Sequence, residues 1–285
     1  MVKKILAGIR RGNLFSPNHV GNDAAIFSLT VELLRKKGYI VNEYPESELT
    51  AKKIKEDFVF NMVRDWVSIR ELQNLEDSGR IVINSGYGIE NCTREKMTHL
   101  FAVSNISSPR SIILQTDENP VPALEKAGLS NCWIKRGDYH AIHREDVTYV
   151  RNTEEAQSML KEYAMRGIRK VVINEHLEGD LVKFYGVAGT DFFYWFYPSD
   201  LQHSKFGYEE INGAANEIHF DKTRLYQLCD EAAKVLNVQI YGGDCIIDKT
   251  GAIWLIDFND WPSFAPCRNE AAPYIVSCIE NFITK

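Results

Sequence analysis

What the sequence lacks excludes several classes of protein. No apolar run approaches the ~20 residues that a membrane-spanning helix needs. The 33 basic residues are fewer than the 39 acidic ones, and the net charge of −6 argues against a nucleic acid as the main partner. The apolar run near the N-terminus is too short for a signal peptide, so we predict a cytoplasmic protein.

Motifs for several common sites are also missing. The six cysteines lack CxxC spacing, which argues against a zinc site or a disulfide framework and favours reduced, buried thiols. The segment Gly86-Tyr87-Gly88 follows a predicted strand, but residue 91 is Asn, so the GxGxxG dinucleotide pattern fails. We find no internal repeat, and no Ser-His-Asp arrangement that indicates a side-chain nucleophile.

The first third of the sequence alternates between strand and helix patterns. Short β-branched runs are separated by stretches in which apolar residues recur at helical spacing. The predicted strands are residues 3–9, 39–44, 58–62 and 80–84. This order predicts a doubly wound α/β unit. A break at Ser107-Ser108-Pro109 then divides the chain into an N-terminal α/β domain (1–106), a central subdomain (107–170) and a C-terminal subdomain (171–285).

Residues 241–264 contain the most informative pattern. Two apolar runs, 245–247 and 253–256, flank a polar turn with Gly251, which predicts a β-hairpin. Asp244 begins the first arm, and Asp257 and Asn259 end the second. Because residues two apart in a strand share a face, we expect the hairpin to bring these three side chains together.

Three oxygen-bearing side chains beside apolar strands indicate a cation site. One alone would be a turn-forming residue at a strand end. Three together favour a cation, because buried carboxylates are costly without compensation. A small number of oxygen ligands suits Mg²⁺ or Mn²⁺ that keeps waters and shares phosphate oxygens. We predict that the ligands are Asp244, Asp257 and Asn259.

With these parts in this order, most of the chain resembles an ATP-grasp enzyme. The segment Asp257-Phe258-Asn259 with Pro262 is similar to the family's (D/E)xN..P signature. GRIVINS followed by Lys96 resembles the RimK-type ligase pattern, and VVINEHLEGDLVKFYGV resembles the family's adenine hinge and the strand after it. The resemblance implies an α/β ATP-grasp fold, in which an N-terminal α/β domain precedes two subdomains that grip ATP with Mg²⁺ or Mn²⁺.

The resemblance also implies roles for single residues. Lysines at two positions contact the phosphates, backbone groups of the hinge hold the adenine edge, and an acid binds the ribose. The implied nucleotide-binding set is Lys96, Lys135, Glu175, His176, Leu177, Glu178 and Lys183. Any one of these residues alone would indicate only an exposed lysine or a surface turn. The prediction depends on all of them occurring in the family's order.

The sequence departs from the family's pattern in two places. The lid loop of many relatives is Gly-rich, whereas this loop has Gly137 alone, and Arg136 or His140 is the candidate to contact the phosphates instead. Ser263 replaces the glycine that follows the last proline of the signature. Arg268 is the candidate catalytic residue, which would stabilise a tetrahedral intermediate or anchor the substrate carboxylate; a surface arginine is the alternative.

The resemblance implies a ligase that joins a carboxylate to an amine through an acyl phosphate. Its partners would be small molecules, such as amino acids or peptides. Arg10, Arg11 and His19 follow the first strand, where they would suit an anionic substrate or form part of a charged surface. The alternatives are a small-molecule kinase of the inositol-phosphate-kinase type, which Asp257 and Lys183 favour, and an ATP-binding module without catalysis. The sequence leaves the substrates and the oligomeric state, a homodimer included, open.

Overall fold

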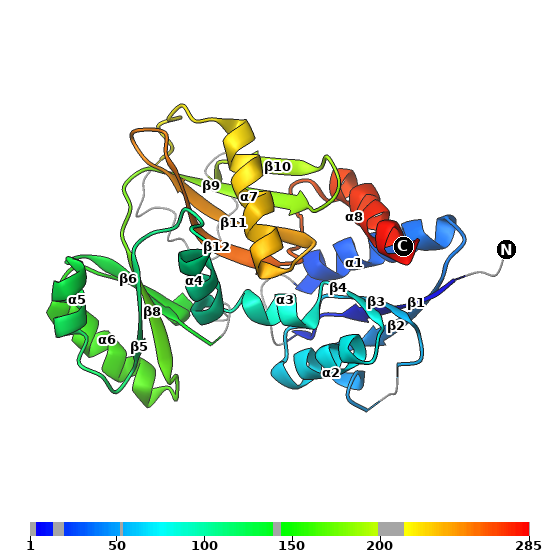
Figure 1. Ribbon diagram of the computed structural model, residues 1–285, viewed down its shortest axis with the longest axis horizontal. Coiled ribbons are helices and arrows are strands. Elements are labelled where there is room, and N and C mark those ends of the chain that lie inside the picture. Colours follow the sequence, from blue (N-terminus) through cyan, green and yellow to red (C-terminus); the bar gives the residue numbers. More distant parts are fainter. Residues whose placement is uncertain (1–3, 14–19, 52–53, 139–143, 199–213, 285) are drawn as a thin grey trace.

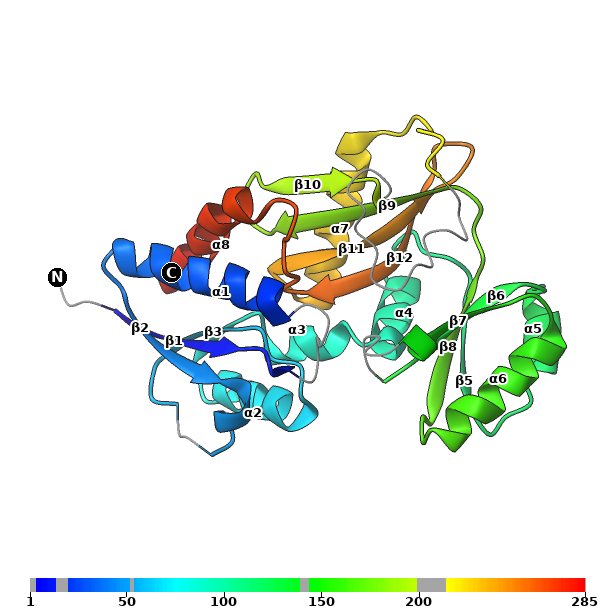
Figure 2. The same cartoon turned by 180° about the vertical axis from the view of Figure 1, so that it is seen from behind.

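The computed structural model describes residues 4–13, 20–51, 54–138, 144–198 and 214–284. In these ranges the chain forms three four-stranded sheets that follow one another along the sequence (Figures 1 and 2). No helix within the same ranges is both long enough and apolar enough to cross a membrane.

The first sheet is parallel, with the strand order β2-β1-β3-β4. Its strands are β1 (Ile5–Arg10), β2 (Ile40–Pro45), β3 (Phe58–Asn61) and β4 (Ile81–Ile83), and a short 3-10 turn, η2 (Glu46–Glu48), follows β2. Alternate strand residues point to opposite faces, so Leu6 is buried with helix α1 (Val20–Lys36), whereas Ala7 is buried with α2 (Trp66–Asp77). The predicted doubly wound α/β unit is confirmed.

Two helices lead from the first sheet to the second. They are α3 (Gly86–Asn91) and α4 (Arg94–Val103). A Cβ atom at Gly88 would clash with the carbonyl of Asn237, which ends helix α7 (Lys222–Leu236). Glycine is therefore required here for close packing between α3 and the end of α7, which explains a Gly-containing segment that fails the dinucleotide pattern.

The second sheet is antiparallel, with the strand order β5-β8-β6-β7. Its elements are β5 (Ser111–Gln115), α5 (Val121–Ala127), β6 (Cys132–Arg136), the 3-10 turn η3 (Arg144–Asp146), β7 (Val147–Val150), α6 (Thr153–Met165) and β8 (Lys170–Glu175). Both helices cover one face, where Ile134 and Leu160 belong to a buried apolar core. Trp133 and Lys135 alternate with Ile134, so they lie on the opposite face of β6.

The third sheet contains the predicted hairpin. Its strand order is β10-β9-β11-β12, all antiparallel. Its strands are β9 (Asp180–Val187), β10 (Phe193–Phe196), β11 (Ile240–Ile247) and β12 (Ile253–Asp260), and helix α8 (Arg268–Ile283) ends the chain. Helix α7 packs on one face, whereas α8 packs against α1 of the first sheet. The hairpin prediction is confirmed, with β11 and β12 as its arms.

The change from the second sheet to the third lies between β8 and β9. Strand β8 pairs with β5 and β6, and it therefore belongs to the second sheet although the predicted limit at residue 170 assigns it to the third unit. We propose that the limit lies near residue 177, in the short connection between these strands. The other subdomain limits stay a prediction.

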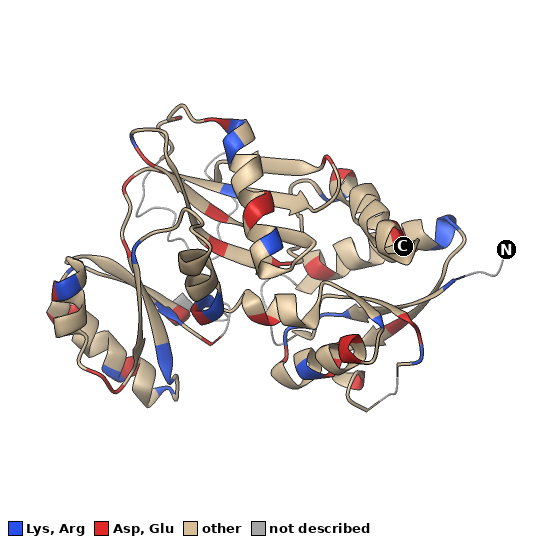
Figure 3. Cartoon of the chain, in the orientation of Figure 1, with Lys and Arg blue, Asp and Glu red and all other residues tan. Residues whose placement is uncertain are grey.

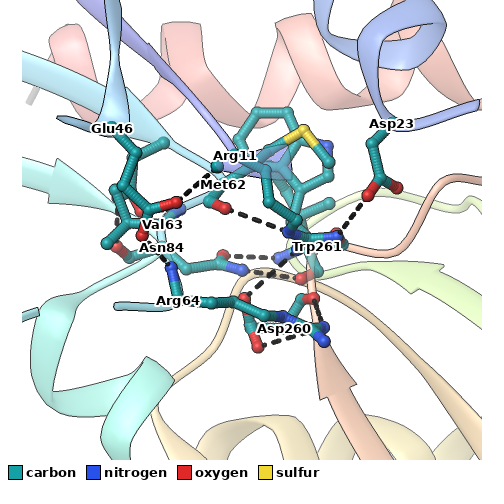
Figure 4. Close-up of polar contacts among 12 residues, drawn as sticks. Arg11, Asp23, Glu46, Met62, Val63, Arg64, Asn84, Asp260 and Trp261 are labelled. Atoms are coloured by element: carbon teal, nitrogen blue, oxygen red, sulfur yellow. Dashed lines mark hydrogen bonds and ion pairs between the residues drawn. The ribbon is translucent and has the colours of Figure 1, made fainter. Parts of the chain in front are cut away.

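Buried polar side chains join the first sheet to the hairpin (Figure 4). The Arg11 guanidinium donates to the carbonyls of Met62 and Trp261, at 3.1 and 3.0 Å, and to Asp23 at 3.0 Å. Asp260 has an oxygen 3.7 Å from Arg11 and another 3.5 Å from Arg64. Burial alone would lower the pKa of Arg11, but Asp23 and Asp260 raise it above its ordinary value, so this arginine stays charged.

Two further buried residues complete this junction. Glu46 accepts hydrogen bonds from the backbone N–H groups of Arg64 and Asp65, both at 2.6 Å, and burial raises the pKa of its carboxyl. Asn84 follows β4 and is fully buried. Its Nδ2 donates to the Ile240 carbonyl at 2.7 Å, and its Oδ1 accepts from the N–H groups of Gln239 and Ile240 at 3.0 and 2.9 Å.

We expect Asn84→Ala to lower the free energy of unfolding by about 3 kcal/mol, because it removes the acceptor of the Gln239 and Ile240 backbone N–H groups and one of the two donors to the Ile240 carbonyl. Urea unfolding followed by circular dichroism measures this loss. Asn74→Ala is the matched control, since the side chain of the exposed Asn74 bonds only to Glu71 among the hydrogen bonds described, and we expect a change within about 0.5 kcal/mol. A loss below about 1 kcal/mol for Asn84→Ala would show that the junction contributes little.

Candidate active site

Three predicted residues meet on one face of the third sheet. In the antiparallel register, Asp244 of β11 lies opposite both Lys183 of β9 and Asp257 of β12. Directly opposed residues point to the same face, so all three side chains share it. Lys183 Nζ lies 3.1 Å from Asp244 Oδ1. The strand pairing therefore places two carboxylates and a lysine side by side.

The end of β12 sorts its residues between the two faces. Asp257 and Asn259 share the face with Asp244, whereas Phe258 points the other way and packs against Tyr241 with ring centroids 5.1 Å apart. Asn259 lies opposite Gly242, where a Cβ atom would clash with the side chains of Tyr185 and Pro262. The predicted ligand set of two carboxylates and one amide is therefore gathered on one face.

This donor set fits a divalent cation of the magnesium type. Such ions bind through one or two carboxylates and complete their shell with water or phosphate oxygens. The side chains of Asp244 and Asp257 are 26% and 19% exposed, so both can reach a ligand. Among the described residues, no group of three or more His, Cys, Asp or Glu side chains is placed to hold a metal. Water or oxygens of a bound substrate would complete the shell.

Lys135 reaches from the second sheet to the third. Its Nζ donates to the Ile256 carbonyl at 3.0 Å, and only 8% of the residue is exposed. Ile256 is the extra residue of a β-bulge, because Asp257 pairs with Asp244 whereas Leu255 pairs with Cys245. Burial and the nearby Arg94 lower the pKa of Lys135 to about 8, although Asp257 and Asp244 act in the opposite direction.

Arg94 is a residue that the sequence analysis missed. It begins α4, its side chain is 4% exposed, and its Nη2 lies 3.5 Å from Asp257 Oδ2. Lys96, which the resemblance suggested instead, is 46% exposed and forms an ion pair with Glu90 at 2.7 Å. The structure therefore brings Arg94, and not Lys96, to the carboxylates. Both are basic residues of one helix, so the sequence carried no signal to choose between them.

Glu95, between these two residues, holds the start of α4 against the second sheet. Its backbone N–H donates to the Gly137 carbonyl at 3.0 Å, and its carboxylate pairs with Lys170 at 2.5 Å. Gly137 in turn donates its N–H to the carbonyl of Lys170 at 3.0 Å. The backbone that carries Arg94 is therefore anchored to β8 and to the loop after β6.

The predicted adenine hinge follows β8. Glu175 ends this strand, and its carboxylate accepts two hydrogen bonds from Arg110, at 3.0 and 2.8 Å, which lower its pKa. Leu177 is partly buried, and Glu178 is exposed. The proposed contacts of the Glu175 carbonyl and the Leu177 N–H with adenine stay a prediction.

His176 belongs to an aromatic cluster beside this hinge. Trp133 Nε1 donates to His176 Nδ1 at 3.1 Å, and Tyr149 lies 5.2 Å from Trp133 and 5.0 Å from His176 between ring centroids. Burial lowers the pKa of His176, which agrees with a neutral ring that accepts this hydrogen bond. Trp133 and Lys135 share a face of β6, so the cluster and the lysine form one continuous surface.

The remaining candidates that the structure describes have other partners or are exposed. Arg268 begins α8 and donates to Asn22 Oδ1 at 3.0 Å. Arg11 is taken up by the buried junction, Arg10 is exposed, and Arg136 forms an ion pair with Asp138 at 2.6 Å. His19 and His140 lie outside the described residues. The interpretation of Arg11 as a substrate contact is disfavoured, because its guanidinium is 5% exposed and already has protein partners.

Comparisons with known proteins establish the fold. Neither a protein-family model nor a curated protein matches the sequence. Among solved structures, D-alanyl-alanine synthetase A from Vibrio cholerae is similar over 100% of both chains, with a TM-score of 0.73 and 13% identity.

Two other ligase structures agree. The D-alanine–D-alanine ligase from Bacillus anthracis complexed with ATP has a TM-score of 0.68 and 16% identity, covering 99% of this chain and 96% of its own. The VanG D-Ala:D-Ser ligase from Enterococcus faecalis has the same TM-score and 14% identity, with 99% of each chain covered. The ATP-grasp superfamily contains the D-Ala–D-Ala ligases. The RimK-like and inositol-phosphate-kinase-like subtypes stay predictions, and the chain as a whole has the ATP-grasp fold.

Proposed function

We propose that this protein is an ATP- and Mg²⁺-dependent ligase that joins a carboxylate to an amine through an acyl phosphate. The observation that carries the proposal is the meeting of Lys135 with the bulge that presents Asp257 and Asn259. That contact joins the second and third sheets beside the ion pairs of Arg94 with Asp257 and of Lys183 with Asp244. Phosphoryl transfer needs mainly such positioning and charge compensation, and little covalent chemistry from the protein.

The nucleotide would bind between the second and third sheets. The backbone at Glu175 and Leu177 would hold the adenine, with the aromatic surface of Trp133 beside it, and Glu178 would bind the ribose. The basic residues proposed to contact the phosphates are Lys135, Lys183, Arg94 and Lys96. Arg94 and Lys135 are nearly excluded from water, which strengthens their interaction with a bound anion.

Asp244, Asp257 and Asn259 would hold the metal. A bound Mg²⁺ would neutralise charge on the β- and γ-phosphate oxygens as the terminal phosphoryl group moves to the substrate carboxylate. Mn²⁺ could take the same oxygen ligands. In this scheme the carboxylates of the protein do not transfer a proton. They contribute by holding the metal at the position where the transition state develops charge.

The acceptor substrates would be small molecules. The solved structures that resemble this chain are named for alanine and serine substrates, which supports amino acids as the class to test first. Arg268 is proposed to contact the substrate carboxylate or the tetrahedral intermediate that the amine forms on the acyl phosphate. Its bond to Asn22 ties it to the start of α1, next to the junction residue Asp23.

Product analysis separates this ligase from its alternatives. A ligase releases ADP and phosphate only when both the carboxylate and the amine are present. A small-molecule kinase, which Asp257 in the signature favours slightly, leaves a stable phosphorylated product and no free phosphate. A binding module shows a nucleotide-dependent rise in melting temperature without turnover. Screening pairs of amino acids for ADP release is the direct test.

We expect Asp257→Asn to lower turnover at saturating MgATP by about a thousandfold, whereas the affinity for MgATP weakens only partly, because the lost charge acts mainly where transition-state charge develops. Coupled ADP release and calorimetry measure the two effects. Asp230→Asn, on the outer helix α7, is the control with unchanged turnover. Unchanged turnover for Asp257→Asn would refute the metal assignment.

The lowered pKa of Lys135 predicts a pH-dependent affinity for ATP. In the nucleotide-free protein about half of this ammonium has lost its proton near pH 8, whereas bound phosphates favour its charged form and raise its pKa. We therefore expect metal-free ATP affinity to fall about tenfold between roughly pH 7 and pH 9, with proton uptake on binding. Calorimetry in two buffers of different ionisation enthalpy measures this uptake.

Lys135→Met should abolish this pH dependence, and Lys161→Met, which changes an exposed residue of α6, should preserve it. An affinity of the wild-type protein that stays constant from about pH 7 to 9 would contradict the role of Lys135.

A further inference from the structure

The two carboxylates of the proposed metal site already have cationic partners in the protein. Lys183 lies 3.1 Å from Asp244 on the neighbouring strand, and Arg94 lies 3.5 Å from Asp257 although α4 belongs to another part of the chain. Figure 3 shows a basic position and acidic positions on neighbouring strands of the third sheet, where the register places Lys183 beside Asp244. Each carboxylate is thus compensated by a side chain from a different element.

This pairing has a physical cause. The carboxylates are about four-fifths buried and the guanidinium almost wholly so, and burial of an isolated charge is costly. Removing one partner of such a pair leaves the other charge uncompensated. Without a bound cation, Arg94 and Lys183 therefore supply the positive charge that Asp257 and Asp244 require.

Asp244 and Asp257 cannot pair fully with Lys183 and Arg94 and bind a metal ion at the same time. A carboxylate that binds a metal directs its oxygens to that ion, and its former partner then requires another anion. The proposed function puts such an anion, a polyphosphate, beside these residues. Glu95, Lys170 and Gly137 anchor the start of α4. Arg94 would therefore change its partner by a rotation of its side chain, without movement of the helix.

We propose that Arg94 and Lys183 are internal counter-ions that exchange their partners when MgATP binds. This inference rests on the proposed function. In the exchange, the divalent cation takes Asp257 and Asp244, and the released guanidinium and ammonium groups pair with phosphate oxygens. No bond is broken or formed covalently; four charges change partners.

The exchange makes metal and nucleotide dependent on each other. Without metal, ATP must compete with the two carboxylates for Arg94 and Lys183. Without ATP, the metal must displace these two side chains from the carboxylates although no other anion is there to pair with them. Each ligand therefore increases the affinity for the other, and by linkage the two factors are equal. Loss of either internal pair should reduce this coupling.

Calorimetric titration of the full chain with ATP, in EDTA and in Mg²⁺, tests the exchange. In EDTA, Asp257→Asn should tighten ATP binding about tenfold, because Arg94 is released from its partner. In Mg²⁺ the same substitution should weaken binding, so its effect reverses sign.

A double-mutant cycle separates exchange from simple repulsion. If Asp257 only repels the phosphates, Asp257→Asn tightens metal-free binding equally with and without Arg94. If Arg94 is a captive counter-ion, the gain falls from about tenfold to less than about twofold in the Arg94→Gln background. Equal gains in both backgrounds would overturn the proposal.

The second pair provides an independent cycle. Asp244→Asn and Lys183→Gln should show the same coupling, and both side chains are more exposed than Arg94, so this cycle serves as the test if an Arg94 variant fails to fold. The matched control is the ion pair of Asp230, half-buried, and Lys234, exposed, on α7, for which Asp230→Asn and Lys234→Gln should change ATP affinity less than about twofold.

The outcomes distinguish the exchange from the function on which it rests. Wild-type protein that binds no ATP, with or without Mg²⁺, would refute the proposed function. Wild-type protein that binds MgATP, with additive effects in both cycles, would leave that function standing and refute the exchange.

Discussion

The charged side chains and the bulged carbonyl at the end of strand β12 need partners. The second sheet, helix α4 and the first unit each supply one or more of them. The Ile256 carbonyl accepts from Lys135 of the second sheet, Asp257 pairs with Arg94 of α4, and Asp260 lies between Arg11 and Arg64 of the first unit. Buried polar groups without partners are costly, so these contacts determine how the three sheets meet.

Acidic side chains are paired with basic ones on both faces of β12, but the two faces differ in exposure and in role. Asp260, 1% exposed, points toward the first sheet and lies between Arg11 and Arg64, and Arg11 also donates to two backbone carbonyls. Asp257 points to the opposite face, where it is more exposed and its partner comes from a single helix. We interpret the enclosed side as a permanent junction and the open side as a set of charges that a ligand can rearrange.

Some of this arrangement was predictable because it depends on local periodicity. A Gly-containing turn between two apolar runs specified the hairpin, and the period of two in a strand put Asp257 and Asn259 on one face. The resemblance to ATP-grasp enzymes named Lys183 as a phosphate contact, which stays a prediction. Its position beside Asp244 came only from the structure, because nothing local in the sequence sets the register of β9 against β11.

The sequence by itself determined most of the elements, the hairpin and the face on which the proposed ligand set lies, because strand and helix periods are properties of neighbouring residues. Only the tertiary structure decided that Arg94 and not Lys96 meets Asp257, that β8 joins the second sheet, and that Arg11 is buried in a junction. Residues two apart in a helix differ by about 200° in direction, so the packing of α4 alone selects between them. Contacts across more than a hundred residues depend on how buried charges find partners, which no local pattern encodes.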